Sequence, residues 1–288
     1  MRFLYLLTAA MAVSCNSDSQ IIREIEESGL EETSGIEYIA GTKTLWAVED
    51  SGNKNNIYGF NAEGERIAEI NIKGVKNIDW EDLASDKEGN IYIGDFGNND
   101  NLREDLSIYK ISKNSLSAKA ATPVSKISFY YPEQKDFPPK KSKRFFDVEA
   151  FIESNGSFYL FTKNRSAKFD GSFYIYKVPN KEGLHAAELI TTLKSCAIYN
   201  RCAITGAAMS PDSKTIALLA ADKIWLLTDF ENDSFSHKNM QVYSLNHFSQ
   251  KEGITFKDNI TLLIADEKDK KTGGRLYEIN LRDLKAKR

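Results

Sequence analysis

The sequence predicts an all-β fold, a β-propeller of five four-stranded blades, from three observations. A pair of short strands joined by a tight turn recurs five times along the 288 residues. A third strand follows every copy, and no segment has the pattern of a long amphipathic helix. Antiparallel four-stranded units that repeat about every forty to fifty residues are typical of propellers. Six blades is the alternative.

The start of the chain is expected to be an export signal and not part of the fold. An apolar run at 3–13 is too short to span a bilayer as a stable helix. Small residues then precede Cys15, which resembles the bacterial lipoprotein signal, in which the cysteine is lipidated and becomes the first mature residue. We predict a signal peptide at 1–14, a tether at 15–20 and a single propeller domain at 21–288. An ordinary signal peptide is the alternative.

Charge and hydropathy restrict the partners. The chain carries 38 Lys and Arg residues against 41 Asp and Glu residues, with no long basic run, so nucleic acid is not an expected partner. No second apolar segment approaches the length of a membrane span. We therefore expect an exported protein that is held at a bacterial membrane, with the outer membrane favoured, by lipid alone. It would face the periplasm or the cell surface.

Two further cysteines, Cys196 and Cys202, are six residues apart. The predicted export sends them to an oxidising compartment, where a local disulfide can persist. A metal or redox pair is the alternative, but redox motifs place the cysteines closer together and no histidine lies nearby.

The repeated unit begins with an inner strand, a turn rich in Gly, Asn or Asp, and a second strand that ends in charged or amide residues. The copies cover 34–50, 79–100, 147–165, 204–222 and 251–267. Third strands, usually with Tyr or Trp in the middle, follow at 57–60, 106–109, 173–176, 224–227 and 276–279.

Fourth strands are expected in only four copies. They lie at 67–72, 124–130, 187–193 and 241–245. The fifth copy runs into a charged, helix-prone segment at 281–288, so its fourth strand must come from elsewhere. Residues 21–25 alternate apolar and polar side chains and precede the first copy. We predict that they close the ring as the outer strand of the last blade, which removes two exposed sheet edges.

The repeats also predict a ring of polar side chains. Aligned copies give one equivalent position at the start of each inner strand, occupied by Ser34, Glu81, Glu149, Thr205 and Glu252. Inner strands line the central channel of a propeller, so the three glutamates would converge near one mouth. Because calcium binds six to eight oxygens, we predict that Glu81, Glu149 and Glu252 hold Ca²⁺. The alternative is a structural ring bonded to water and backbone amides.

A second set of polar residues follows the second strands and would emerge on the same face. It consists of Asp50, Asp95, Asn98, Lys163, Arg165, Asp222 and Asp266. Acids, an amide and two cations would suit a sugar, a phosphate ester or a peptide as ligand. The alternative is a solvated face, which is the commoner fate of charged loops.

The inner-strand segments 80–84, 148–151 and 251–254, together with 90–95, resemble the bacterial propellers grouped as SdiA-regulated, NHL-like or gluconolactonase-like. They are also similar to the five-bladed calcium-activated apyrases, and that resemblance implies a central calcium held by acids from inner strands. In lactonase-type enzymes a metal-binding Glu belongs to the first inner strand, where this chain has Ser34. The difference argues against a simple transfer of lactonase chemistry.

Two classes of function follow. The first is a binding or scaffold lipoprotein that recognises a small molecule, a glycan or a protein at the cell envelope, and we favour it because no recognisable motif arranges a nucleophile with a base. The second is a calcium-dependent hydrolase of a phosphate ester, a lactone or another ester, with its site at the channel mouth.

Overall fold

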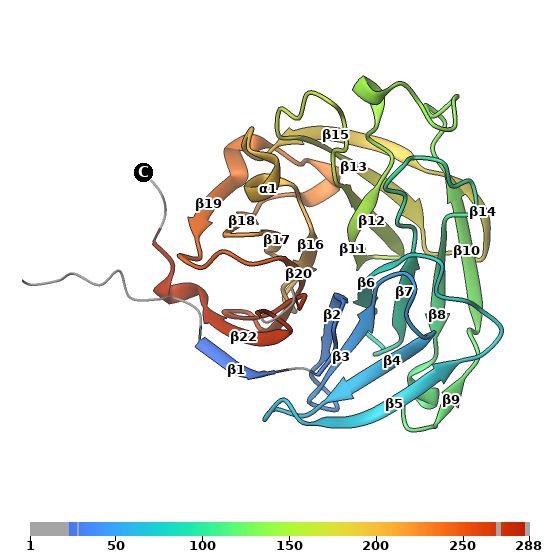
Figure 1. The fold of residues 1–288 in the computed structure, drawn as a ribbon, viewed down its shortest axis with the longest axis vertical. Coiled ribbons are helices and arrows are strands. Elements are labelled where there is room, and N and C mark those ends of the chain that lie inside the picture. The colour runs from blue at the N-terminus through green and yellow to red at the C-terminus, as the bar shows by residue number, and fades with distance from the viewer. Residues whose placement is uncertain (1–22, 28, 269–271, 286–288) are drawn as a thin grey trace, which may run out of the picture.

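The computed structural model describes residues 23–27, 29–268 and 272–285. Their strands form five sheets that stand around a central channel (Figure 1). The five-bladed propeller is confirmed, and the six-bladed alternative is wrong. The predicted signal peptide, Cys15 and the tether lie outside the described residues. In the part of the chain that is described, no helix has the length and apolar character needed to cross a membrane.

Each of the first four blades is built from strands that follow one another in the chain. The first contains β2 (Thr33–Ile39), β3 (Thr44–Glu49), β4 (Asn56–Phe60) and β5 (Arg66–Ile72). The second contains β6 (Trp80–Ser85), β7 (Ile91–Asp95), β8 (Ser107–Ile111) and β10 (Ser125–Tyr130). The third contains β11 (Val148–Ser154), β12 (Ser157–Thr162), β13 (Ser172–Pro179) and β15 (Glu188–Lys194). The fourth contains β16 (Gly206–Met209), β17 (Ile216–Ala220), β18 (Lys223–Leu227) and β19 (Met240–Ser244).

The fifth blade joins the two ends of the chain. Its strands are β20 (Lys251–Asp258), β21 (Thr261–Asp266), β22 (Arg275–Asn280) and, outermost, β1 (Arg23–Glu27). β1 pairs antiparallel with β22, and Figure 1 shows it beside the last blade. The predicted closure of the ring by an N-terminal strand is therefore confirmed, with the described strand at 23–27 where the sequence predicts 21–25.

Two short strands extend neighbouring blades and were not predicted. β9 (Ala120–Ala121) lies in the chain between two strands of the second blade but pairs parallel with β5 of the first. β14 (Gly183–Ala186) lies between two strands of the third blade but pairs parallel with β10 of the second. Each covers part of the outer edge of the preceding blade, where a strand would otherwise expose unpaired backbone groups.

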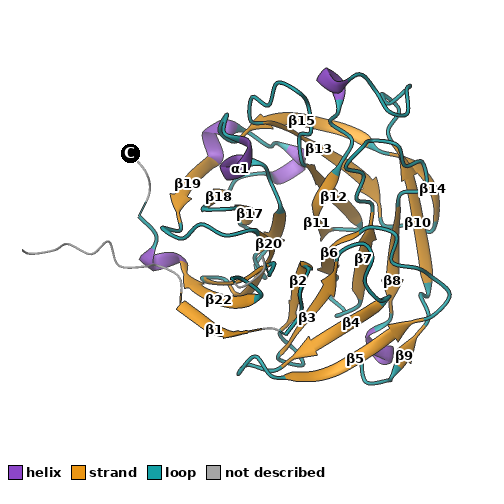
Figure 2. Cartoon of the chain, in the orientation of Figure 1, coloured by secondary structure: helices purple, strands orange, loops and turns teal. Residues whose placement is uncertain are grey.

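Among the described residues, the helical turns lie in the connections between strands (Figure 2). One α-helical turn, α1 (Tyr199–Cys202), includes Cys202, which forms a disulfide with Cys196 across a Cα–Cα distance of 5.3 Å. The 3-10 turns are η1 (Lys113–Ser115), η2 (Lys141–Lys143), η3 (Glu231–Asp233), η4 (His237–Asn239) and η5 (Leu281–Asp283).

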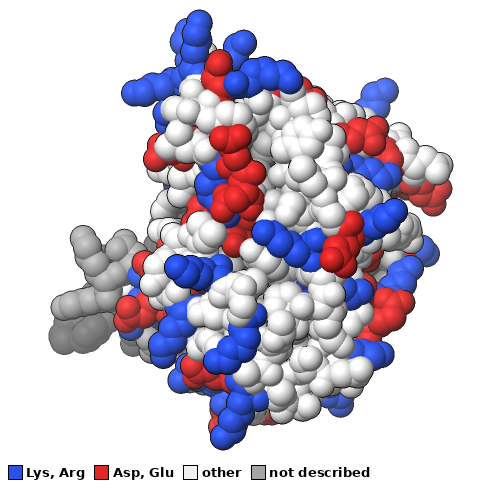
Figure 3. All heavy atoms as spheres, turned by 90° about the vertical axis from the view of Figure 1, so that its right-hand side faces the viewer, with Lys and Arg blue, Asp and Glu red and all other residues white. Residues whose placement is uncertain are grey.

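The hydrophobic core lies between the blades. Alternate side chains of each strand point to opposite faces of its sheet, so each sheet buries residues against both neighbours. Between the second and third blades, for example, Phe96 packs edge-on against Phe151, and Tyr92 against Phe158. On the outer side shown in Figure 3, Lys and Arg side chains are interspersed with Asp and Glu. The packed blades hold the inner strands in fixed positions around the channel.

Candidate functional site

Four of the five aligned ring positions are β-bulges. In the second blade Trp80 lies opposite Asp95 and Asp82 opposite Gly94, so Glu81 is an extra residue without a partner in the ladder. The pairings place Ser34, Glu149 and Glu252 in the same way in their blades. A bulge bends the strand and redirects a side chain. These four residues start the inner strands at one end of the channel, which we call the channel mouth.

The two hydroxyl residues of the ring join neighbouring blades. Ser34 Oγ donates a hydrogen bond to the carbonyl oxygen of Trp80 at 2.7 Å, and Thr205 Oγ1 donates to that of Lys251 at 2.7 Å. Each bond runs from one inner strand to the next. At these two positions the ring has a structural role.

Glu81 belongs to a group of carboxylates from two blades. One oxygen each of Asp50, Asp79 and Glu81 lies within 4.8 Å of the others. Glu81 is only 4% exposed, yet no described residue donates a hydrogen bond to its carboxyl group or forms an ion pair with it. Gly97 packs against Glu81 and Asp79 so closely that a side chain there would collide with both carboxyl groups.

Burial is the largest cause of the raised pKa values in this group. Burial and the charge of Glu149 raise the pKa of Glu81 well above its usual value. Burial and the charge of Asp50 raise the pKa of Asp79 to about 6. Carboxylates held this close repel one another unless a proton or a cation neutralises them.

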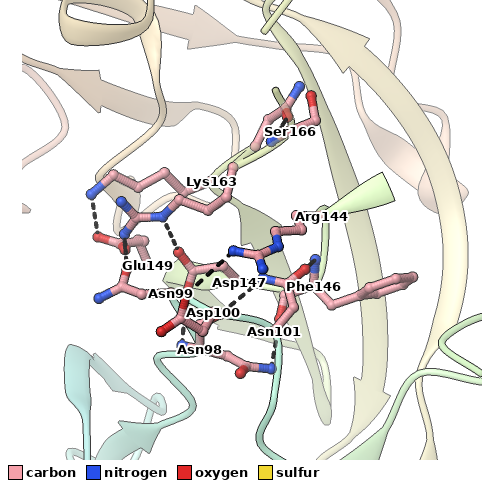
Figure 4. Close-up of polar contacts among 12 residues, drawn as sticks. Asn98, Asn99, Asp100, Asn101, Arg144, Phe146, Asp147, Glu149, Lys163 and Ser166 are labelled. Atoms are coloured by element: carbon pink, nitrogen blue, oxygen red, sulfur yellow. Dashed lines mark hydrogen bonds and ion pairs between the residues drawn. The ribbon is translucent and has the colours of Figure 1, made fainter. Parts of the chain in front are cut away.

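A second carboxylate group shares Glu81 but contains its own cations. One oxygen each of Glu81, Asp147 and Glu149 also lies within 4.8 Å of the others. Lys163 Nζ lies 2.8 Å from Glu149 Oε2 (Figure 4), and Arg165 lies 2.6 Å from Glu149 Oε1 and 2.5 Å from Asp147 Oδ2. Burial would raise the pKa of Glu149, but Lys163 and Arg165 outweigh it and hold that pKa below its usual value.

The donor sets of the two groups differ in how well they fit a metal ion. Asp50, Asp79 and Glu81 offer carboxylate oxygens, which calcium prefers, and none of the three has an ion pair with a described Lys or Arg. Asp147 and Glu149 already form ion pairs with Arg165, and Glu149 forms a second one with Lys163. The described residues thus contain two groups able to hold a metal, and the first fits Ca²⁺ better.

The predicted set of Glu81, Glu149 and Glu252 is only partly brought together. Glu81 and Glu149 share the second group, whereas Glu252 lies 4.0 Å from Lys163 and next to Glu267. Burial and the charge of Glu252 raise the pKa of Glu267 to about 9. Metal binding by these three glutamates stays a prediction.

Two of the predicted ligand-binding residues make structural contacts below the mouth. Asp95 Oδ1 lies 2.9 Å from a guanidinium nitrogen of Arg103 and also accepts a hydrogen bond from the backbone N–H of Asp79 at 3.2 Å. Asn98 donates its backbone N–H to Asp147 Oδ1 at 2.7 Å. Both residues are buried. They position the carboxylates of the channel mouth.

Two others lie toward the fourth and fifth blades. Asp222 pairs with Arg201 at 2.5 Å and with Lys223. Asp266 is buried and accepts a hydrogen bond from the Tyr277 hydroxyl at 2.8 Å. Asp266 lines a cavity, whereas Asp222 is not among the lining residues.

That cavity, which we call the mouth cavity, has a volume of about 740 Å³. Its lining includes Lys163, Arg165 and Glu252 from the channel mouth, together with the aromatic residues Tyr199, Phe248 and Tyr277. Small-molecule sites commonly have volumes of about 300–1,000 Å³. A ligand in the mouth cavity would contact charged groups at the channel and aromatic rings of its lining.

Two carboxylates of these groups, Asp79 and Asp147, belong to neither of the sets predicted from the sequence. Each precedes its ring glutamate by two residues, so the second and third blades share an Asp-x-Glu pattern at 79–81 and 147–149. This repeat is a sequence signal that would have found them.

The pH dependence of stability follows from these shifts. Asp79 and Asp147 have folded pKa values of about 6 and about 7, above their unfolded value near 4. The folded state therefore binds more protons, and the stability that these groups contribute is present below pH 4 and is lost as the pH rises through 6 to 7. We expect the melting temperature of the metal-free protein to be higher at pH 5.5 than at pH 8. Each kcal/mol by which the free energy of unfolding differs between the two pH values should change the melting temperature by roughly 2–4 °C. Asp79→Asn should reduce the difference, and a higher melting temperature at pH 8 would contradict the assignment.

Among known proteins, solved structures resemble this chain in fold. No protein-family model matches the chain, and no curated protein matches it. The PQQ-bound aldose sugar dehydrogenase from Streptomyces coelicolor is similar over 90% of this chain and 97% of that chain, with a TM-score of 0.53 and 10% identity. The likeness shows the fold. The resemblance to bacterial propellers is confirmed at this level.

Two other solved structures have weaker scores. A gluconolactonase from Xanthomonas campestris gives a TM-score of 0.49 and 11% identity over 92% of this chain and 89% of that chain. Regucalcin, a calcium-binding protein from Agrobacterium tumefaciens, gives a TM-score of 0.44 and 13% identity over 89% of this chain and 92% of that chain.

Proposed function

We propose that this protein is a calcium-dependent binding module of the bacterial cell envelope. The cation would be held at the channel mouth by Asp50, Asp79 and Glu81, and a polar small molecule or glycan would occupy the mouth cavity beside it. The observation that carries the proposal is Glu81, a carboxyl group that is 4% exposed, has no hydrogen-bond donor among the described residues and lies within a group of carboxylates.

Calcium would supply two things at this position. Its charge would offset the repulsion among the three carboxylates. Because Ca²⁺ takes six to eight oxygen ligands, three carboxylates would leave positions for water or for hydroxyl and carboxylate oxygens of a ligand. Lys163 and Arg165, which line the mouth cavity, would favour a ligand that carries negative charge or many hydroxyl groups.

Thermal melts at pH 7 test the proposal. A ligand that binds only the folded state stabilises it, by about 2.7 kcal/mol at a free concentration 100 times the dissociation constant. Calcium should therefore raise the melting temperature of the metal-free protein by roughly 5–10 °C, and EDTA should reverse the rise. If sodium chloride of equal ionic strength gives the same rise, the effect is screening and the proposal is wrong.

The envelope location rests on the sequence and has its own test. We propose that Cys15 carries the lipid that anchors the protein, because an apolar run and small residues precede it. Cys15→Ala should move the protein from the membrane fraction to the soluble envelope fraction. Cys196→Ser, at a cysteine of the disulfide, is the matched control and should remain in the membrane fraction. A Cys15→Ala protein that still sediments with membranes would refute the anchor.

A calcium-dependent hydrolase is the second candidate. The observation that favours it is the position of Lys163 and Arg165 between carboxylates and the mouth cavity, where they would bind the anionic part of an ester. Nucleotides, lactones and phosphate esters, each assayed with calcium and with EDTA, separate the two candidates. Turnover that EDTA abolishes would favour the enzyme, and binding without turnover would favour the module.

A further inference from the structure

A second cavity lies at the opposite end of the channel, where the inner strands reach their turns. It has a volume of about 570 Å³, and we call it the turn-side cavity. Each of the five blades contributes an apolar side chain to its wall, Ile39, Leu83, Ile152, Ala208 and Phe256. The carboxylates of the channel mouth are not among its lining residues, so it is separate from the mouth cavity.

The lining also contains polar side chains, and among them Glu37 is held by residues of two neighbouring blades. The Glu37 carboxyl group accepts hydrogen bonds from Ser85 Oγ at 2.5 Å and from Thr255 Oγ1 at 2.9 Å. Thr255 Oγ1 itself accepts from the backbone N–H of Tyr38 at 3.1 Å, so its proton is directed to Glu37. Three blades thus hold the carboxyl group in one orientation. Each of its oxygens keeps acceptor capacity beyond the hydroxyl it already binds.

The described part of the chain provides no counter-ion for Glu37. None of the described Lys and Arg residues forms an ion pair with it, and burial raises its pKa to about 7. Asp82, buried just below, accepts backbone N–H groups from Leu83 at 2.8 Å and Phe151 at 3.0 Å and adds a second carboxyl group without a cation. Three further carboxyl groups line the cavity; Asp86 is paired with Lys110 at 3.2 Å, and the two lysines of the lining are exposed.

We propose that the turn-side cavity binds a small organic amine in its protonated form, with the ammonium group on Glu37 and an apolar body against the wall. A charge-assisted hydrogen bond is stronger than a neutral one, and the ammonium would supply the cation that Glu37 lacks among the described residues. An anion would meet carboxyl groups instead. The side chains of Ile39, Leu83 and Phe256 suit an apolar body better than a sugar, because hydroxyl groups placed against them would lose their bonds to water.

Three probes that differ mainly in charge test the proposal: benzylamine, benzyl alcohol and benzoate. They are titrated into the purified protein at pH 7.5 in EDTA, with binding measured by NMR line broadening. EDTA keeps the channel mouth free of metal, so the result does not depend on the proposed calcium site. We expect benzylamine to bind at least tenfold more tightly than the alcohol, and benzoate not to bind. Equal affinity for the amine and the alcohol would overturn the proposal.

Variants locate the site. Glu37→Gln keeps the size of the side chain but removes its charge, so benzylamine should lose about tenfold or more in affinity while benzyl alcohol changes little. Glu153→Gln, at another carboxyl group of the same lining, is the matched control and should change affinity less than threefold. Met209→Trp places a larger side chain in the same lining and should abolish binding of both probes. Unchanged benzylamine binding in either Glu37→Gln or Met209→Trp would refute the site.

Discussion

Replacing Arg165 by Met is expected to lower the free energy of unfolding by about 3–5 kcal/mol, because it leaves buried carboxylates without their partner. Arg165 is 22% exposed, whereas the side chains of Asp147 and Glu149 that it contacts are 0% and 4% exposed. Asp147 would keep only its bond from the Asn98 amide, and Glu149 would keep only Lys163. Urea unfolding of the metal-free protein measures the loss.

A more exposed arginine provides the matched control. Arg201 lies 2.5 Å from Asp222, but its side chain is 51% exposed, so Arg201→Met should cost less than about 1 kcal/mol. Adding Asp147→Asn and Glu149→Gln to Arg165→Met should restore part of the lost stability, since the uncompensated charges are then gone. If Arg165→Met lowers the free energy of unfolding no more than Arg201→Met does, the second carboxylate group does not depend on Arg165 for its stability.

Deleting residues 23–27 should have a comparable effect by opening the ring. Four residue pairs join β1 to β22 in the fifth blade. At about 1 kcal/mol for each backbone hydrogen bond, their loss costs roughly 2–6 kcal/mol. The deletion also exposes the outer edge of β22, which promotes pairing with other chains. Thermal melts and light scattering should record a lower melting temperature together with aggregation.

The control for this deletion lies in the predicted tether. Removal of residues 16–20 shortens the chain by the same number of residues and should leave the melting temperature unchanged. If the deletion of 23–27 behaves in the same way, β1 does not close the propeller, and the last blade is stable with three strands.

Much of the fold is predictable from the sequence because each blade repeats the same local pattern. The strand alternation, the turn residues and the aligned ring position recur in order, and they identify five blades and the N-terminal strand that closes the ring. β9 and β14 are not predictable in this way, since they contain two and four residues and are defined only by pairing with a strand of the preceding blade.

The candidate site is less predictable, because it depends on contacts between blades. Alignment places Glu81 and Glu149 at equivalent positions, but it does not show that Asp50 of the first blade reaches Asp79 of the second. Nor does it show that Lys163, two residues before Arg165, points back to Glu149 on the neighbouring strand. Lys163 and Arg165 are therefore predicted from the sequence to bind a ligand, whereas in the structure they form ion pairs with Glu149 and Asp147.

Calorimetric titration of the metal-free protein with calcium at pH 7 tests the central claim, that the carboxylates of Asp50, Asp79 and Glu81 hold a cation. The account predicts one Ca²⁺ per chain and a release of protons, measured from the heats in two buffers, because the pKa values of Asp79 and Glu81 are raised in the metal-free protein. Glu81→Gln should abolish binding, whereas Glu63→Gln, which removes an exposed carboxylate elsewhere, should leave it unchanged. A wild-type titration without binding heat up to millimolar calcium, or a Glu81→Gln protein that binds as the wild type does, would contradict the claim.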